Sequence, residues 1–252
     1  MTRRLEFDMN SVNLAVITYK RARGRQGDEM GFSSKAAATK TPSRKARGEG
    51  HTRRDEILAA AKALFLEEGV RATTIRRIAE RVGVSAPALY LYFKDKDSIL
   101  IELCDRIFAR LLARLEEIER EPLPAGQRLR RMGEAYIRFG LEHPDEYRIT
   151  FLEATAPEPV RFTGHRTDTS DLSRPGAKGA LVFSKIVQVY EAVAKEGTRL
   201  PYPPVTCAEL SFLACHGLVA ALIAEPDFPW SDRETLIRGM VEASVRGVVP
   251  TL

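Results

Sequence analysis

The sequence of 252 residues predicts an all-α protein of about nine helices. From residue 51 onward, apolar residues recur at the three- and four-residue spacing of amphipathic helices. Capping residues, glycines and prolines divide these segments, and no stretch reads convincingly as a strand. Two short helices joined by a glycine, followed by much longer helices, indicate a helix-turn-helix head on a larger helical body.

Three helices are expected before residue 95. The first is expected at 52–69 with Thr52 as its N-cap, and the second at 75–82 with Thr74 as its N-cap. The third is a short segment that follows its N-cap, Ser85. Gly83 permits the left-handed conformation that turns the chain sharply between the second and third helices. Pro87 falls in the first turn of the third helix, where its missing N–H costs nothing.

Six further helices are expected in the remainder, separated mainly by prolines. They cover Asp95 to about Glu121, 128–142, 145–155, about 183–197, 205–224, and a last helix from a Ser231 cap to Gly247. The polar, glycine-rich stretch 159–176 between them is expected to be a loop.

Residues 1–50 stand apart by charge. They hold 11 Lys and Arg against 5 Asp and Glu, whereas the remaining 202 residues hold 28 against 29. Apart from a short apolar stretch at 11–19, little in this segment can be buried, so we expect a disordered basic tail. Such a tail either attracts DNA phosphates without sequence preference or is a solvated extension without a role. A third alternative is an extension created by an upstream start codon, since translation could also begin at Met9 or Met30.

Composition favours a protein of the cytoplasm. The three cysteines, Cys104, Cys207 and Cys215, form no CxxC pair, which disfavours a disulfide framework and a cysteine-bound zinc ion. No apolar run is expected to reach the roughly 20 residues that span a bilayer, and no signal peptide is visible. We therefore expect no membrane contact, no metal and no cofactor.

The helix-turn-helix carries side chains suited to DNA. Those that can approach base edges in the major groove are Arg76, Ser85, Ala86, Pro87 and Ala88. Those placed to contact phosphates are Tyr90, Tyr92, Lys94 and Lys96. On periodicity alone, a plain hairpin of two core helices is an equal alternative.

The run TTIRRIAERVGVSAPALYLYFKDKDSIL at 73–100 contains a distinctive order of residues. Its parts are Thr73–Thr74, Ile78–Ala79, Gly83–Val84, Leu89–Tyr90, Tyr92–Phe93 and Lys96. In this order the run resembles the signature of the TetR family of bacterial regulators, and the helix at 52–69 resembles the first helix of that family.

The resemblance implies a three-helix DNA-binding domain at 51–97 and a helical effector-binding and dimerisation domain at 98–252. It places phosphate contacts on Thr74, Tyr90, Tyr92 and Lys96, and base reading on Arg76 and residues 85–88. Because Ala86 and Ala88 carry no hydrogen-bonding side chain, we expect readout weighted toward Arg76 and DNA shape.

Small and apolar residues share faces of the last two helices. They are Leu210, Leu213, Ala214, Gly217, Ala220, Ala221 and Ala224, with Leu236, Met240, Ala243 and Val248 beside Gly239 and Gly247. In the family, the last two helices form a four-helix interface between two copies, which implies a homodimer that binds two DNA half-sites about 34 Å apart. The alternative is that these residues belong to the core of one chain.

Aromatic and polar side chains of the body are candidates for a small-molecule site, with plain core packing as the alternative. They are Tyr136, Phe139, His143, Tyr147, Phe151, Phe183, Tyr190, Phe212 and His216. Residues 136–151 and 215–218 also resemble a TetR subgroup with a Trp-His-Gly type of C-terminal domain. Phe212 stands where that subgroup has tryptophan.

The function expected is a transcriptional regulator, most simply a repressor that a small-molecule effector releases from operator DNA. An activator of the same family and a non-specific architectural DNA binder are the alternatives. An enzyme is not expected, because the four histidines are scattered without a catalytic or metal-binding pattern around them.

Overall fold

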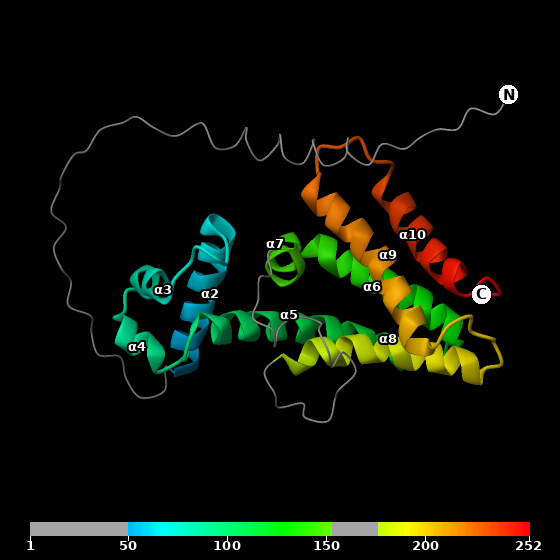
Figure 1. The fold of residues 1–252 in the computed structure, drawn as a ribbon, viewed down its shortest axis with the longest axis horizontal. Coiled ribbons are helices and arrows are strands. Elements are labelled where there is room, and N and C mark those ends of the chain that lie inside the picture. Colours follow the sequence, from blue (N-terminus) through cyan, green and yellow to red (C-terminus); the bar gives the residue numbers. More distant parts are fainter. Residues whose placement is uncertain (1–49, 153–175) are drawn as a thin grey trace. The chain divides into compact units, whose positions relative to one another are not determined.

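The computed structural model describes residues 50–152 and 176–252, and these residues contain nine α-helices, one π-helix and no strand (Figure 1). This confirms the predicted all-α class. The expected basic tail, up to residue 49, and the expected loop, up to residue 175, lie outside the described residues.

The head consists of α2 (Gly50–Glu68), α3 (Ile75–Val82) and α4 (Ala86–Tyr90). The Thr74 hydroxyl accepts a hydrogen bond from the Arg77 N–H at 3.2 Å and begins α3, as predicted. Gly83 ends α3 with a φ of +76°, a conformation that glycine adopts without strain. The predicted Thr52 cap is wrong, because α2 already begins two residues earlier.

The body contains six more α-helices and the π-helix. They are α5 (Lys96–Glu119), α6 (Ala125–Glu142), α7 (Pro144–Tyr147), η1 (Arg148–Leu152), α8 (Ala177–Lys195), α9 (Pro204–Ala224) and α10 (Arg233–Val248). The single helix predicted from residue 145 is instead a four-residue helix followed by the wider π-helix. Asp232, not Ser231, caps α10, because its carboxylate accepts the Thr235 N–H at 2.9 Å.

One apolar core runs through the body, where α6, α8 and α9 pack against one another and α5 and α10 cover them. Helices α6 and α9 approach closely at Gly140. A Cβ atom there would lie 2.6 Å from Val219 Cγ1 and 2.9 Å from the Tyr147 ring. Only glycine fits this crossing, which brings α7 against both helices.

Helix α9 is long and apolar enough to cross a membrane by length and composition alone, contrary to the expectation that no segment would be. The core helices of soluble proteins pass the same test, and α9 packs on α6, α8 and α10. Only 33% of its most apolar window is buried, so much of its apolar surface faces outward.

Candidate functional site

The exposed surface of α3 and α4 carries most of the predicted DNA contacts. Thr74, Arg76, Ser85, Pro87 and Tyr90 are exposed, and Ala86, Ala88 and Tyr92 are half-buried. The Arg76 side chain is 85% exposed, and its Nε lies 3.1 Å from a Glu80 carboxylate oxygen. The guanidinium therefore lies at the surface, tethered by one exposed contact.

Helix α4 has one buried and one exposed side. Leu89 is fully buried, while Pro87, Tyr90 and Leu91 share the opposite face at the i, i+3, i+4 spacing. Leu91 is 84% exposed and was missed by the sequence analysis. Its spacing from Pro87 is the signal that identifies it.

Lys94 and Lys96 differ in their surroundings. Lys94 is 83% exposed, whereas the Lys96 ammonium donates hydrogen bonds to the carbonyls of Val70, Arg71 and Thr73 at 2.6, 3.3 and 2.9 Å. An ammonium has three N–H donors, and these carbonyls use all of them. The phosphate contact expected for Lys96 is thus not available in this conformation. Lys96 instead fixes the loop between α2 and α3.

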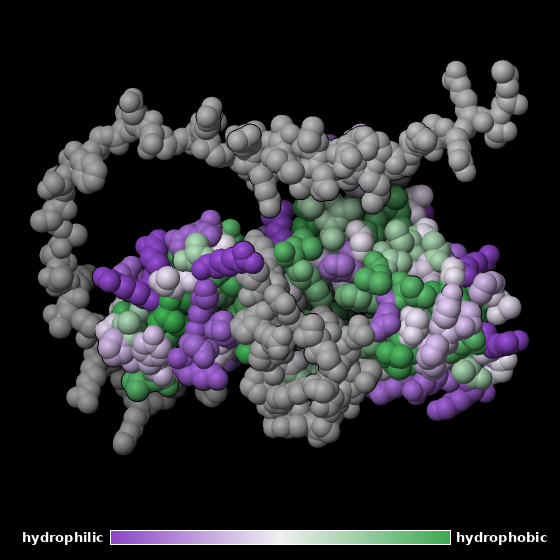
Figure 2. All heavy atoms as spheres, in the orientation of Figure 1, coloured by the Kyte–Doolittle hydropathy of each residue, from purple (hydrophilic) through white to green (hydrophobic). Residues whose placement is uncertain are grey.

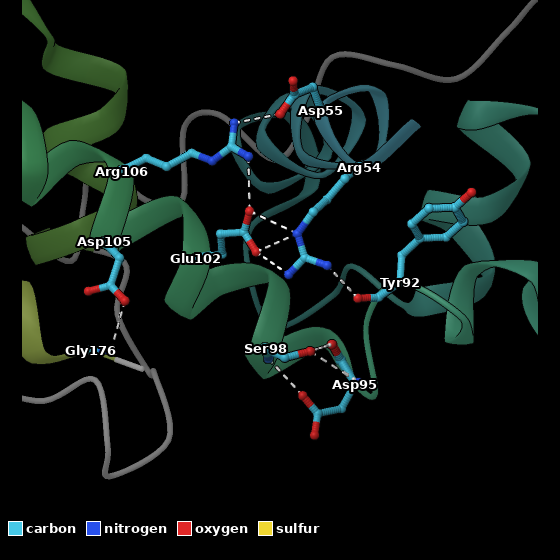
Figure 3. Close-up of polar contacts among 9 residues, drawn as sticks. All are labelled: Arg54, Asp55, Tyr92, Asp95, Ser98, Glu102, Asp105, Arg106 and Gly176. Carbon is cyan, nitrogen blue, oxygen red and sulfur yellow. Dashed lines mark hydrogen bonds and ion pairs between the residues drawn. The ribbon is translucent and has the colours of Figure 1, made fainter. Parts of the chain in front are cut away.

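An ion-pair network ties the head to α5 (Figure 3). The Arg54 guanidinium donates to both Glu102 carboxylate oxygens and, from Nη1, to the Tyr92 carbonyl at 2.8 Å. Arg106 joins Glu102 at 2.9 Å and Asp55 at 2.7 Å. Burial raises the pKa of Glu102, but hydrogen bonds and charges from Arg54 and Arg106 outweigh it and hold that pKa below its ordinary value.

The body contains a partly open cavity of about 50 Å³ between α5, α6, η1, α8, α9 and α10. Five predicted effector residues line it: Tyr136, Phe151, Phe183, Tyr190 and Phe212. Other lining residues, including Phe108, Met132 and Ser211, were not predicted from the sequence. Helical periodicity marks a buried face, but it does not say which buried residues border empty space.

Tyr147 and His216 lie behind the cavity wall, not on it. The Tyr136 hydroxyl is 2.9 Å from the Tyr147 hydroxyl and 3.4 Å from His216 Nδ1, and Tyr147 also bonds to that nitrogen. Burial lowers the pKa of His216 and raises that of Tyr136 well above its ordinary value. Burial therefore favours the uncharged forms of His216 and Tyr136.

Phe139 and His143 do not line this cavity, so an effector contact for these two residues stays a prediction. Their rings pack on each other at 4.9 Å, and the Arg114 guanidinium lies 5.2 Å above the Phe139 ring. Both residues lie near the end of α6, just before Pro144, where α6 faces arginines of α5. The spacing of aromatic residues in the sequence does not predict this neighbour.

Glu146 joins the head to the body from α7. Its carboxylate binds Lys62 of α2 at 2.8 Å and Arg110 of α5 at 2.9 Å, with His143 Nδ1 at 3.4 Å. Burial raises the pKa of Glu146, but the bonds to Lys62 and Arg110 outweigh it, so the pKa lies below its ordinary value. The next residue, Tyr147, reaches the cavity wall.

Helices α9 and α10 expose part of the predicted dimer face. Leu210 is 40% exposed and Leu213 60%, with Gly217 and Ala243 also exposed. Figure 2 shows hydrophobic side chains, in green, on the surface over α9. Val248 does not belong to this face, because it is buried in the core of its own chain.

Two family models match the chain. Residues 57–103 match the bacterial regulatory proteins of the tetR family, and residues 129–244 match the tetracyclin repressor-like C-terminal domain. Together they cover α3 and α4, most of α2 and most of the body. The match to the first model includes the run at 73–100 that carries the resemblance.

Similar proteins include the transcriptional activator FasR of Mycolicibacterium smegmatis, 33% identical over 108 residues, which are 42% of this chain and 49% of FasR. The repressor KstR2 of Mycobacterium tuberculosis is 39% identical over 71 residues, 28% of this chain and 36% of KstR2. The match thus spans about half or less of each relative.

Solved structures share the fold at low identity. The fatty acid degradation regulator FadR from Bacillus halodurans aligns with a TM-score of 0.59 at 17% identity, over 81% of this chain and 98% of that one. Fold, head and both family models agree: the chain belongs to the TetR family of bacterial transcriptional regulators.

Proposed function

We propose that this chain is a homodimeric, sequence-specific DNA-binding regulator of the bacterial cytoplasm whose operator affinity is changed by a small molecule in the body cavity. Regulators of this family bind operator DNA and small-molecule effectors and act as dimers. The observation that carries the proposal is the exposed face of α4, with small residues at its start and exposed arginine and lysine side chains on either side. Such a helix fits the major groove.

Repression is the simplest form of this function, because an effector then only has to weaken operator binding. Activation is the second candidate, since the similar proteins include a named activator as well as a named repressor. Both forms require the same DNA contacts and the same cavity.

Arg76 and Lys94 are expected to have different roles in DNA binding. Arg76→Ala should relax the base preference at one position of each half-site, because a guanine contact through arginine contributes about 1–3 kcal/mol of discrimination. Lys94→Ala should weaken binding to all sequences alike and reduce the salt slope by about one. Random-library DNA selection and salt titrations measure both effects. An unchanged motif with Arg76→Ala contradicts the assignment.

The dimer is proposed to form through the exposed faces of α9 and α10. Leu210, Leu213 and Gly217 lie on one exposed side of α9 at helical spacing, and Ala243 is exposed on the neighbouring α10. Small residues among the leucines let a partner helix approach closely. A two-fold pairing of these faces supplies the two heads that a palindromic operator needs.

Helix α7 is the proposed link between the cavity and the head. Tyr147 bonds to the cavity residue Tyr136, and its neighbour Glu146 bonds to Lys62 in the head. An occupant that moves Tyr147 therefore acts on a helix that also holds α2. Coupling of about 3 kcal/mol through such a contact would change operator affinity about 150-fold.

A further inference from the structure

The chemistry of the cavity wall limits what the cavity can hold. Among the described residues, the lining contains only uncharged side chains, mostly aromatic and aliphatic. Its polar members are already paired within the protein: Tyr190 with Ser211, Ser244 with the Val241 carbonyl, and Tyr136 with Tyr147. An ionised ligand group would lose its hydration here without gaining an opposite charge, which is strongly unfavourable.

The hydrogen-bond order at the wall leaves one acceptor for a ligand. The direction of these bonds depends on the tautomer of His216. We assign the proton of neutral His216 to Nε2, so that Nδ1 accepts from the Tyr147 hydroxyl and the Tyr147 oxygen accepts from the Tyr136 hydroxyl. The Tyr136 oxygen then keeps a lone pair with no donor among these three groups. Tyr136 is a lining residue, and a ligand that reaches its hydroxyl can donate a hydrogen bond to this lone pair.

The size of the cavity shows that binding must move side chains. A cavity of about 50 Å³ is smaller than the roughly 150 Å³ that holds benzene. Phe151 and Phe212 are half-buried lining residues, and their rings contact Tyr147 at 4.7 Å and His216 at 5.4 Å. An occupant that displaces either ring therefore disturbs the same polar groups that adjoin Glu146.

We propose that the effector is a neutral, predominantly apolar molecule with a hydrogen-bond donor, such as a hydroxyl, that donates to the Tyr136 oxygen. The role of this molecule as an effector rests on the proposed function. The preference of the cavity for such a molecule does not, and it can be measured without DNA. It excludes carboxylates and amines as the preferred ligands.

Calorimetric titration of the full chain with matched eight-carbon probes tests the charge preference. The probes are 1-octanol, octanoate, octylammonium and heptyl methyl ether, at pH 7.5. Octanol should bind at least about tenfold more tightly than either ion, because each ion is desolvated without a partner. It should also bind about two- to tenfold more tightly than the ether, which cannot donate. Tighter binding of octanoate, or no octanol binding at millimolar concentration, overturns the proposal.

Tyr136→Phe separates a specific hydrogen bond from apolar capture. The variant should lose the preference for octanol over the ether and keep the ether affinity, whereas the exposed control Tyr202→Phe should keep both. A retained octanol preference in Tyr136→Phe contradicts the assigned acceptor. Operator affinity, followed separately by fluorescence anisotropy, distinguishes the two proposals. Octanol that binds as ranked without changing operator affinity supports the ligand class and contradicts the effector role.

Discussion

Leu213→Glu is expected to convert the dimer to a monomer and to lower operator affinity by at least about 100-fold, because two linked heads bind far more tightly than one. Leu213 is 60% exposed in the single chain, so the substitution leaves the fold intact. In the proposed pairing of helices, the same glutamate would be buried without an opposite charge.

Sedimentation measures the mass and anisotropy measures operator affinity in the same samples. Ala194→Glu is the matched control, since it adds the same charge to an exposed position of α8. It should remain a dimer with unchanged affinity. A Leu213→Glu protein that stays dimeric and binds normally would place the interface elsewhere.

Arg54→Met is expected to lower the free energy of unfolding by about 2–3 kcal/mol and to weaken operator binding. Methionine keeps the packing of the side chain but loses charged hydrogen bonds to Glu102 and the Tyr92 carbonyl, each of which contributes about 1.5–3 kcal/mol. The arginine is 36% exposed, so the sum is reduced by solvent. Tyr92 follows α4, so its loss of support reaches the DNA-binding surface.

Denaturant unfolding at several pH values measures this effect and its origin. The pKa of Glu102 is lower in the folded state than in the unfolded chain, so its pairing stabilises above about pH 4.3 and is lost as pH falls through the folded-state pKa. The difference between wild type and Arg54→Met should therefore shrink as the pH falls below about 4.3. The control Arg106→Met breaks more exposed pairs and should cost less than about 1 kcal/mol. Equal costs for the two variants would contradict the role given to Arg54.

Local signals in the sequence predict the head well. The Thr74 and Ser85 caps and the Gly83 turn each depend on residues within one or two turns, and all three are present as expected. The number and order of helices also follow from proline and glycine positions. These features are set by backbone chemistry, which neighbouring residues reveal.

Contacts between residues far apart in the chain could not be predicted from the sequence. Lys96 bonds to carbonyls some 25 residues earlier, and Glu146 meets Lys62 across 84 residues. The aromatic pattern identified five cavity residues but also included Phe139, which packs against arginines of α5, and His143, which packs on Phe139. Periodicity indicates that a side chain is buried, whereas only the packed helices determine what it is buried against.

Random-library DNA selection with residues 1–252 tests whether this protein reads a DNA sequence as a dimer. We expect a palindromic motif whose two half-sites have centres about one helical turn, or 10 base pairs, apart, bound by a dimer. Strong binding at low salt with no enriched motif would contradict it and would leave only sequence-independent attraction to DNA.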